Sequence, residues 1–355
     1  MPNMPALDPL SPSMPRRRAL CLGALLPLGG ALAACGSGHA AQPGADAPQP
    51  VQQALARFAA LAPETSGALV RSHAWPDAEA GTAGWQAAHA PERTLFTGSA
   101  TKSFMLAEFL RRTEAAQAPL SADAPCVIDD GVRSPSSAVF ANLNGHTPYR
   151  SVLEAMITHS DNTATDAVLA AVRPDAVRAL IAQAGLASVQ IPDSTRKLFS
   201  CLAGAPSGTD LGWEGMQRLE RDEDLGLTPL TDPSTAPQTM IGSAEDMVRW
   251  YEGALAGRWF AKADTLREFR RIQAMANALA LVMPPGLAAY GKGGSIDWEG
   301  FHALCLPGQM VVGRRAVSFC FTLNWRDGLD SVQRLPEFVG HVAPVLQAAA
   351  DALAA

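Results

Sequence analysis

Hydrophobic positions follow two different periods along the chain, and these periods separate expected helices from expected strands. Apolar residues at strand-like spacing predict strands at 67–72, 85–96, 288–297, 301–312 and 316–325. Apolar residues spaced three and four apart predict helices at 51–61, 149–157, 163–172, 174–185, 247–255, 265–280 and 337–353, with another directly after Ser99. The segment 200–238 shows no clear period and is rich in Gly, Pro, Asp and Thr, so we expect a functional loop or a disordered insertion there.

The order of these elements predicts an α+β fold. Strands lie near both ends of the domain, and most of the helices lie between them. One sheet assembled from both chain ends, with an inserted all-α subdomain over about 97–280, fits that order. We therefore expect one domain over 51–355.

The N-terminus is predicted to be a signal peptide, 1–35. Three arginines at 16–18 precede the apolar stretch 19–31, which is too short to span a membrane. Leu-Ala-Ala and Cys35 follow and resemble a bacterial lipobox, whose cysteine is lipidated. This resemblance implies a periplasmic protein anchored by lipid to a bacterial membrane, inner or outer. The alternative is an ordinary signal peptide with an incidental cysteine.

The Gly-, Ala-, Pro- and Gln-rich segment 36–50 is predicted to be a flexible tether. The start codon stays open between Met1 and Met14, because residues 1–13 add little to a signal peptide.

Composition narrows the range of partners. The net charge of −6 and the 48% hydrophobic content are typical of a soluble globular domain. Basic residues are scattered and are not interleaved with aromatic residues, so no nucleic-acid partner is expected. The histidines lack metal-ligand spacing and there is no Cys-x-x-Cys pair, so we expect no metal and no cofactor. We expect a monomer that acts on a small molecule.

Four cysteines lie in the predicted domain: Cys126, Cys201, Cys305 and Cys320. An even number in an exported protein permits disulfides, and Cys305 and Cys320 fall on consecutive predicted strands. Cys305 and Cys320 either form a disulfide bridge or are buried free thiols. The same two alternatives are open for Cys126 and Cys201.

Ser99 and Lys102 are the first candidates for chemistry. The chain has only four lysines, and one lies three residues after Ser99 at the start of a predicted helix, so both side chains project from one face. Lysine loses its proton when its surroundings disfavour the cation, whereas arginine stays charged. The pair therefore predicts a serine nucleophile beside an amine base.

Two further motifs carry polar side chains that suit amide chemistry. Ser160-Asp-Asn162 occupies a turn between two predicted helices, where helix capping is the favoured interpretation of the motif taken alone. Lys292-Gly-Gly294 lies in a predicted strand, where glycine indicates close approach of another group to the backbone.

Taken in order, these three motifs resemble the signature of class A β-lactamases and penicillin-binding proteins. The chain is similar to the penicillin-recognising serine hydrolase superfamily, and most similar to its class A β-lactamase-related branch, from about residue 51 to the C-terminus. The resemblance implies a β-lactamase/transpeptidase-like fold with an antiparallel sheet.

The resemblance also implies a role for each residue. Ser99 would form an acyl-enzyme and Lys102 would help to remove its proton. Ser160 would pass a proton to the leaving nitrogen, and Asn162 would hold the substrate amide. Lys292 would bind a substrate carboxylate. The strand residues Gly294 and Ser295 would border the substrate, and the backbone N–H groups of Ser99 and Ser295 would form the oxyanion hole.

One departure from the family pattern concerns deacylation. Class A β-lactamases use a glutamate after the Ser-Asp-Asn helix, and the corresponding stretch 185–199 contains no glutamate. Thr195 falls near that position, and Asp193 is the nearest carboxylate. Asp193 either activates the hydrolytic water or caps the turn after Pro192.

Three functions therefore stay open. The first is β-lactamase-like hydrolysis through an acyl-enzyme. The second is a D,D-peptidase or esterase that uses the same residues on peptidoglycan-type substrates. The third is a non-catalytic lipoprotein that binds cell-wall fragments.

Overall fold

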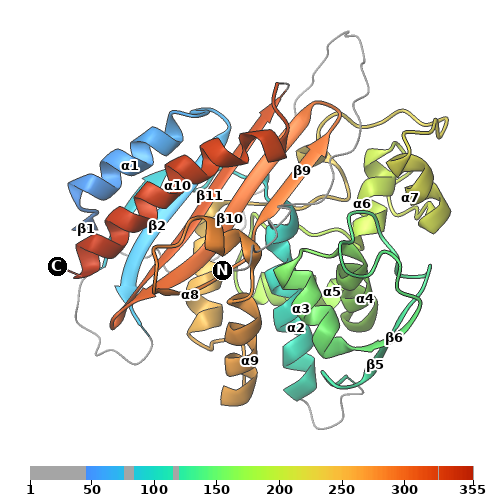
Figure 1. Cartoon of the computed structure of the whole chain (residues 1–355), viewed down its shortest axis with the longest axis horizontal. Helices are drawn as coiled ribbons and strands as arrows, with labels where there is room; N and C mark the ends of the chain where they lie inside the picture. Colours follow the sequence, from blue (N-terminus) through green and yellow to red (C-terminus); the bar gives the residue numbers. More distant parts are fainter. Residues whose placement is uncertain (1–44, 76–83, 115–119, 327, 355) are drawn as a thin grey trace, which may run out of the picture.

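The structure is a computed structural model that describes residues 45–75, 84–114, 120–326 and 328–354. At its centre lies a seven-stranded sheet whose strands come from both ends of the described chain (Figure 1). The strands are β1 (Ala45–Asp46), β2 (Ser66–Ala74), β3 (Trp85–His89), β8 (Ala288–Gly291), β9 (Gly294–Trp298), β10 (Phe301–Val312) and β11 (Arg315–Arg326).

The strand order is β1-β3-β2-β11-β10-β8, and β9 also pairs with β10. Every pair in this sheet is antiparallel except β1 with β3. The α+β architecture with a sheet built from both chain ends is therefore confirmed.

Helices cover both faces of the sheet. On one face α1 (Gln49–Ala59) and α10 (Ser331–Ala354) lie side by side, and α8 (Ala244–Leu255) packs against the other face (Figure 1). The ring of Phe58 meets those of Phe321 and Phe338 edge-on, with centroids 5.2 and 5.8 Å apart. One apolar core thus joins the first helix, the sheet and the last helix.

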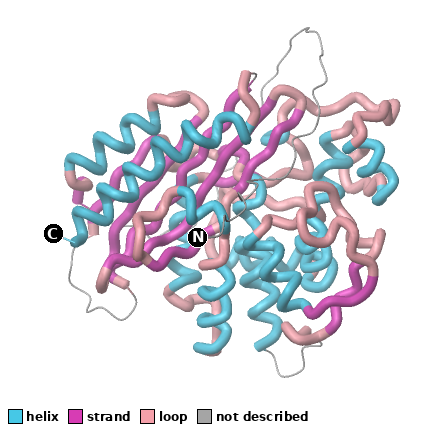
Figure 2. Tube along the Cα trace, viewed as in Figure 1, coloured by secondary structure: helices cyan, strands magenta, loops and turns pink. Residues whose placement is uncertain are grey.

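A second body of helices surrounds α2 (Lys102–Glu114), whose first nine residues are all buried. Around it pack α3 (Tyr149–Thr158), α4 (Asn162–Val172), α5 (Pro174–Gln183) and α9 (Ala263–Gln273) (Figure 2). A helix buried on all sides needs apolar residues around most of its circumference, as α2 has. This body holds Lys102 at the end of α2 that lies nearest the sheet.

The inserted region is not purely helical, which corrects the expectation of an all-α subdomain over about 97–280. Besides the helices it contains one short antiparallel pair, one strand of a second pair and three 3₁₀ turns. The pairs join β4 (Leu95–Phe96) to β7 (Ile241–Gly242) and β5 (Pro125–Ile128) to β6 (Gly145–Pro148). The turns are η1 (Gly98–Thr101), η2 (Pro233–Thr235) and η3 (Asn277–Leu281).

The segment 200–238 is also more regular than its composition predicts. It begins within α6 (Thr195–Leu202) and contains α7 (Gly212–Glu220). In α7 Trp213, Met216 and Leu219 recur every three positions, but the helix is only nine residues long and contains Gly212 and Gly215, which disfavour a helix.

Several other boundaries differ from the prediction; the predicted strand 288–297, for example, is two strands, β8 and β9. The predicted strand 85–96 breaks between β3 and β4, where Ala90 has a φ of +42°. Helix α10 begins six residues before the predicted start because it accommodates Pro336. Part of the predicted tether is ordered structure, since β1 pairs with β3 and α1 begins at Gln49. Cys35 and the predicted signal peptide lie outside the described residues.

Cys126, Cys201, Cys305 and Cys320 are buried free thiols. In the β10–β11 ladder Cys305 lies opposite Thr322 and Cys320 lies opposite Pro307, so the two cysteines are not a directly opposed pair. The structure therefore favours free thiols over the two disulfides.

Candidate active site

Ser99 lies in the 3₁₀ turn η1, and this turn is in close contact with the start of strand β9. A Cβ added to Gly294 would lie 2.0 Å from the Thr97 carbonyl oxygen and 2.9 Å from the Ser99 nitrogen. Gly98 has a φ of +54°, and a Cβ there would meet Ser295 backbone atoms at 3.0 and 3.1 Å. Only glycine permits this approach at both positions. The backbones of Ser99 and Ser295 are therefore brought together, as the expected oxyanion hole requires.

Lys102 is completely buried and its amine is held by the Ser-Asp-Asn turn. Lys102 Nζ donates to the Ser160 carbonyl oxygen at 2.5 Å and to Asn162 Oδ1 at 2.7 Å. A third contact of 3.2 Å joins it to Ser160 Oγ. The structure thus brings Lys102, Ser160 and Asn162 into one cluster, one helical turn from Ser99.

Burial makes the Lys102 ammonium costly. Removal from water lowers the pKa of Lys102 from 10.5 to about 7, although the nearby carboxylates of Asp161 and Asp166 act in the opposite direction. A substantial fraction of this amine is therefore neutral at neutral pH, which is the state that a general base requires.

The three residues of the Ser-Asp-Asn turn have different tasks. Asp161 caps α4 by accepting from the Ala164 N–H, and it also accepts from the N–H groups of Val139 and Phe140. The capping interpretation is therefore confirmed for Asp161. Ser160 has a φ of +59°, and this turn of the backbone directs both its carbonyl and its hydroxyl at Lys102. Asn162 Nδ2 donates to the Pro135 carbonyl oxygen at 2.8 Å.

Lys292 lies just before β9 and is 3% exposed. Its Nζ donates to the Gly293 carbonyl oxygen at 2.7 Å. Burial, followed by repulsion from Lys102, holds the pKa of Lys292 well below its ordinary value. A Cβ at Gly293 would lie 2.7 Å from that of Ala278 in η3, which explains a glycine at this position.

Asp193 pairs with two cationic side chains. Its carboxylate accepts from Arg178 at 2.6 Å and from Lys197 at 3.4 Å. Partial burial acts to raise its pKa, but these two cations outweigh that effect and hold the pKa below its ordinary value. The turn after Pro192 is capped by Ser194, which accepts from the Lys197 N–H.

Asp166 is a buried carboxylate that sequence reasoning did not single out. Thr195 donates to Asp166 Oδ1 through its backbone N–H at 2.7 Å and its hydroxyl at 2.5 Å. Burial raises the pKa of Asp166, although hydrogen bonds from Thr195 and from the Arg196 backbone oppose the shift. Asp166 follows Asn162 by one helical turn, and that spacing was the available signal.

The sequence profile of the Beta-lactamase enzyme family matches residues 50–302. The chain belongs to this family. No significant match appears among curated protein sequences.

Solved structures of β-lactamases and of a protein named PBP-A share the fold. The β-lactamase from Chitinophaga pinensis gives a TM-score of 0.62 at 15% identity over 85% of this chain and 99% of that chain. The β-lactamase from Sphaerobacter thermophilus gives a TM-score of 0.60 at 16% identity over 84% of this chain and 95% of that chain. PBP-A gives a TM-score of 0.60 at 14% identity over 88% of this chain and 99% of that chain. These structures confirm a β-lactamase/transpeptidase-like fold.

No described helix is long and apolar enough to cross a membrane. Across the same residues, no group of three or more His, Cys, Asp or Glu side chains could hold a metal ion.

Proposed function

We propose that this β-lactamase-family serine hydrolase forms an acyl-enzyme at Ser99 with β-lactams or related cyclic and peptide amides. The observation that supports this most strongly is the buried amine of Lys102. Its pKa is about 7, and it lies one helical turn from Ser99. An amine that is partly neutral at neutral pH can take the serine proton, which an ordinary surface lysine cannot.

The acylation step follows from this arrangement. Ser99 Oγ attacks the substrate carbonyl carbon while its proton passes to Lys102 Nζ. The carbonyl oxygen becomes an oxyanion, stabilised by the N–H groups of Ser99 and Ser295. The C–N bond then breaks, and the leaving nitrogen receives a proton through the hydroxyl of Ser160, which contacts Lys102 Nζ. One proton has then moved from the serine to the leaving amine.

Two further side chains would orient the substrate. Asn162 Nδ2 keeps a second hydrogen beyond the one it donates to Pro135, and this hydrogen is proposed to bind the acyl-side amide. Lys292 is proposed to bind a carboxylate on the leaving-group side. A substrate anion beside Lys292 would favour its protonated form and offset the effect of burial.

A second candidate, a D,D-peptidase or esterase, is favoured by the state of the two nearby carboxylates. Asp193 is paired with Arg178 and Lys197, and Asp166 accepts hydrogen bonds from Thr195 and Arg196. Both therefore already have partners, and a base that activates water must be available for that water. Slow deacylation of a β-lactam would follow, and such a compound would then inhibit the enzyme.

We propose that the protein is exported and held on a bacterial membrane by lipid at Cys35, and that it acts as a monomer. The support for export and anchoring is the lipobox-like sequence that ends the predicted signal peptide. Globomycin treatment of expressing cells tests the anchor, since a lipoprotein precursor would then accumulate at higher mass and a non-lipidated protein would be processed as before.

The catalytic proposal is tested by comparing the protein with its Ser99→Ala variant. Each is incubated with a fluorescent penicillin and, separately, with a chromogenic cephalosporin. Ser99-dependent turnover of the cephalosporin supports a β-lactamase, whereas Ser99-dependent labelling without turnover supports the peptidase-like alternative. If the Ser99→Ala variant keeps both the labelling and the turnover, acyl-enzyme formation at this serine is overturned.

A further inference from the structure

The segment between α6 and η2, residues 203–232, contacts both sides of the active site, and we call it the cap segment. On one side it meets β9, where Trp298 Nε1 donates to the Leu230 carbonyl oxygen at 2.7 Å. Leu211, Leu219 and Leu225 of the cap segment pack against the apolar cluster that contains Ile296 and Trp298 of β9. The cap segment is thus fixed to the strand that carries Ser295.

On the other side the cap segment meets residues 129–139, which we call the rim loop. The Glu220 carboxylate accepts from the Ser136 N–H at 3.3 Å, and the Arg133 guanidinium lies over the Trp213 ring at 5.8 Å. The rim loop also supports the catalytic cluster, because Pro135 accepts the hydrogen bond from Asn162. The cap segment therefore connects the strand beside Ser295 to the loop beside Asn162.

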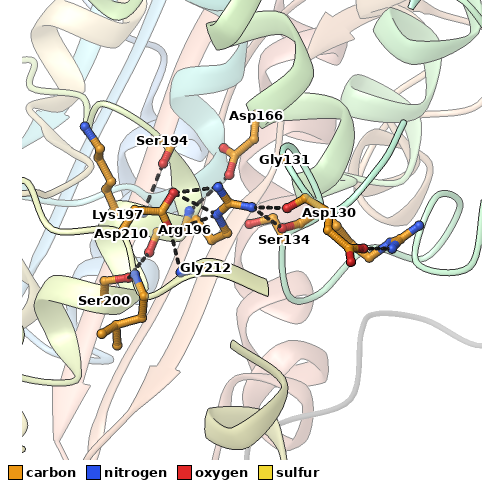
Figure 3. A network of polar contacts seen from close by, with 12 residues as sticks. Asp130, Gly131, Ser134, Asp166, Ser194, Arg196, Lys197, Ser200, Asp210 and Gly212 are labelled. Carbon is orange, nitrogen blue, oxygen red and sulfur yellow. Dashed lines mark hydrogen bonds and ion pairs between the residues drawn. The ribbon is translucent and has the colours of Figure 1, made fainter. Parts of the chain in front are cut away.

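The base of the cap segment is fixed by Arg196 in α6, at the centre of the polar network in Figure 3. Its guanidinium donates to the Asp130 carbonyl oxygen of the rim loop at 2.7 Å and to the Asp210 carboxylate at 2.5 to 3.0 Å. Ser200 Oγ accepts from the Leu211 N–H at 3.1 Å. Because a bidentate guanidinium–carboxylate pair fixes orientation as well as distance, the cap segment is held in one position.

The direction of the substrate follows from the proposed chemistry. The leaving group lies beside Ser160 and Lys292, so the acyl group lies on the opposite side of the scissile carbonyl, beyond Ser295 and next to Asn162. Along β9 in that direction Ser295 is exposed, but Ile296 and Trp298 are only 8% and 5% exposed. Because side chains alternate along a strand, Ile296 and Trp298 lie on the opposite face of β9 from Ser295, in the apolar cluster against which Leu211, Leu219 and Leu225 of the cap segment pack. The cap segment joins the two sides at this end.

We propose that the cap segment closes the acyl end of the site and restricts the enzyme to substrates with short acyl groups. This inference rests on the proposed function. The residues that set the limit are Trp213 and Glu220, through the rim loop, and Trp298, through Leu230. A bulky acyl group would have to displace these contacts before its carbonyl reached Ser99.

The test uses two chromogenic cephalosporins that differ only in the 7-acyl group, one acetyl and one a branched aryl group. We expect the acylation rate constant of the unaltered protein to be at least about 10-fold higher for the acetyl compound, as steric discrimination in a closed pocket gives. In a Trp213→Ala/Glu220→Ala variant the ratio should fall several-fold toward one. The matched control is Arg221→Ala, which should keep the original ratio of the two rate constants. Arg221 is an exposed residue of the cap segment and pairs with Glu223.

The outcomes separate the two proposals. Equal rates for the two compounds in the unaltered protein would overturn the cap proposal and leave acylation at Ser99 standing. Acylation by neither compound would overturn the proposed function and the cap proposal together. If the double variant does not fold, Trp298→Phe decides, because it removes the hydrogen bond to Leu230 and keeps an aromatic ring in the apolar cluster. An unchanged ratio in that variant would overturn the cap proposal.

Discussion

Lys102 Nζ and Asn162 Oδ1 lie 2.7 Å apart, and this contact suits both protonation states of the lysine. Asn162 Oδ1 and the Ser160 carbonyl oxygen can only accept, so they take two N–H bonds from the amine in either state. The third neighbour, Ser160 Oγ, either accepts from the ammonium or donates to the lone pair of the neutral amine. Lys102 thus has hydrogen-bond partners for both of its protonation states.

The first prediction concerns pH. Because the pKa of Lys102 is about 7, the rate of acylation should rise with pH and level off above that value. Below the pKa the amine is protonated and cannot take the Ser99 proton. Above it the neutral amine has a lone pair that can take this proton. Stopped-flow acylation between pH 5 and 9 measures this directly, and a rate that falls as pH rises through 7 would contradict the assignment of Lys102 as the base.

Asp166→Asn should move that pH profile. The Asp166 carboxylate raises the pKa of Lys102, so its removal should shift the midpoint of acylation to lower pH. The exposed Asp175, which pairs with Arg178 on α5, provides the matched control in Asp175→Asn. Equal midpoints in Asp166→Asn and the unaltered protein would show that the Asp166 charge does not act on Lys102.

Asp193→Asn tests the predicted deacylation base. Its carboxylate is held by Arg178 and Lys197 with a pKa below the ordinary value, and such a carboxylate is a weak base. We therefore expect the release of the acyl group, followed by intact-protein mass spectrometry, to slow by no more than about 3-fold. Loss of a general base costs about 100-fold or more, and a change of that size would assign deacylation to Asp193.

Gly294→Ala should damage both stability and acylation. The added methyl group would lie 2.0 Å from the Thr97 carbonyl oxygen, so β9 or η1 must move. Overpacking of this kind costs about 1 to 3 kcal/mol in the free energy of unfolding, and it would separate Ser99 from Ser295. Gly340→Ala in α10 is the matched control, because a Cβ there meets nothing within 4 Å.

Urea denaturation gives the two free energies of unfolding, and stopped-flow labelling gives the two acylation rates. Gly340→Ala should gain about 0.5 to 1 kcal/mol, since alanine favours a helix over glycine. Unimpaired acylation in Gly294→Ala would show that the close approach of β9 to Ser99 is not required.

Much of the fold could be predicted from the sequence because its core elements have strong apolar periods. The strand β10 was predicted with its observed bounds, and α3 and α4 to within one residue. Helix α7 was missed because it is short and contains Gly212 and Gly215, and the early start of α10 was missed because proline within a helix is unfavourable. The pairing of β1 with β3 depends on backbone hydrogen bonds, which leave no pattern in side chains.

The candidate site was predictable where spacing along one helix or turn fixes the geometry. Lys102, Ser160 and Asn162 form the expected cluster, and Asp161 caps α4 as its residue type indicates. The link between Asp166 and Thr195 joins residues 29 positions apart, and a single sequence carries no signal for such a contact. The roles of Asp193 and of the cap segment likewise depend on tertiary contacts with α5, the rim loop and β9.

The central claim is that Ser99 becomes acylated, and peptide mapping of the trapped adduct tests it most directly. The protein is incubated with a penicillin, quenched in acid within seconds, digested and analysed by mass spectrometry. The account predicts an added mass equal to one ring-opened penicillin on Ser99, and its absence in Ser99→Ala. An adduct on another residue, or an equal adduct in the Ser99→Ala protein, would contradict it.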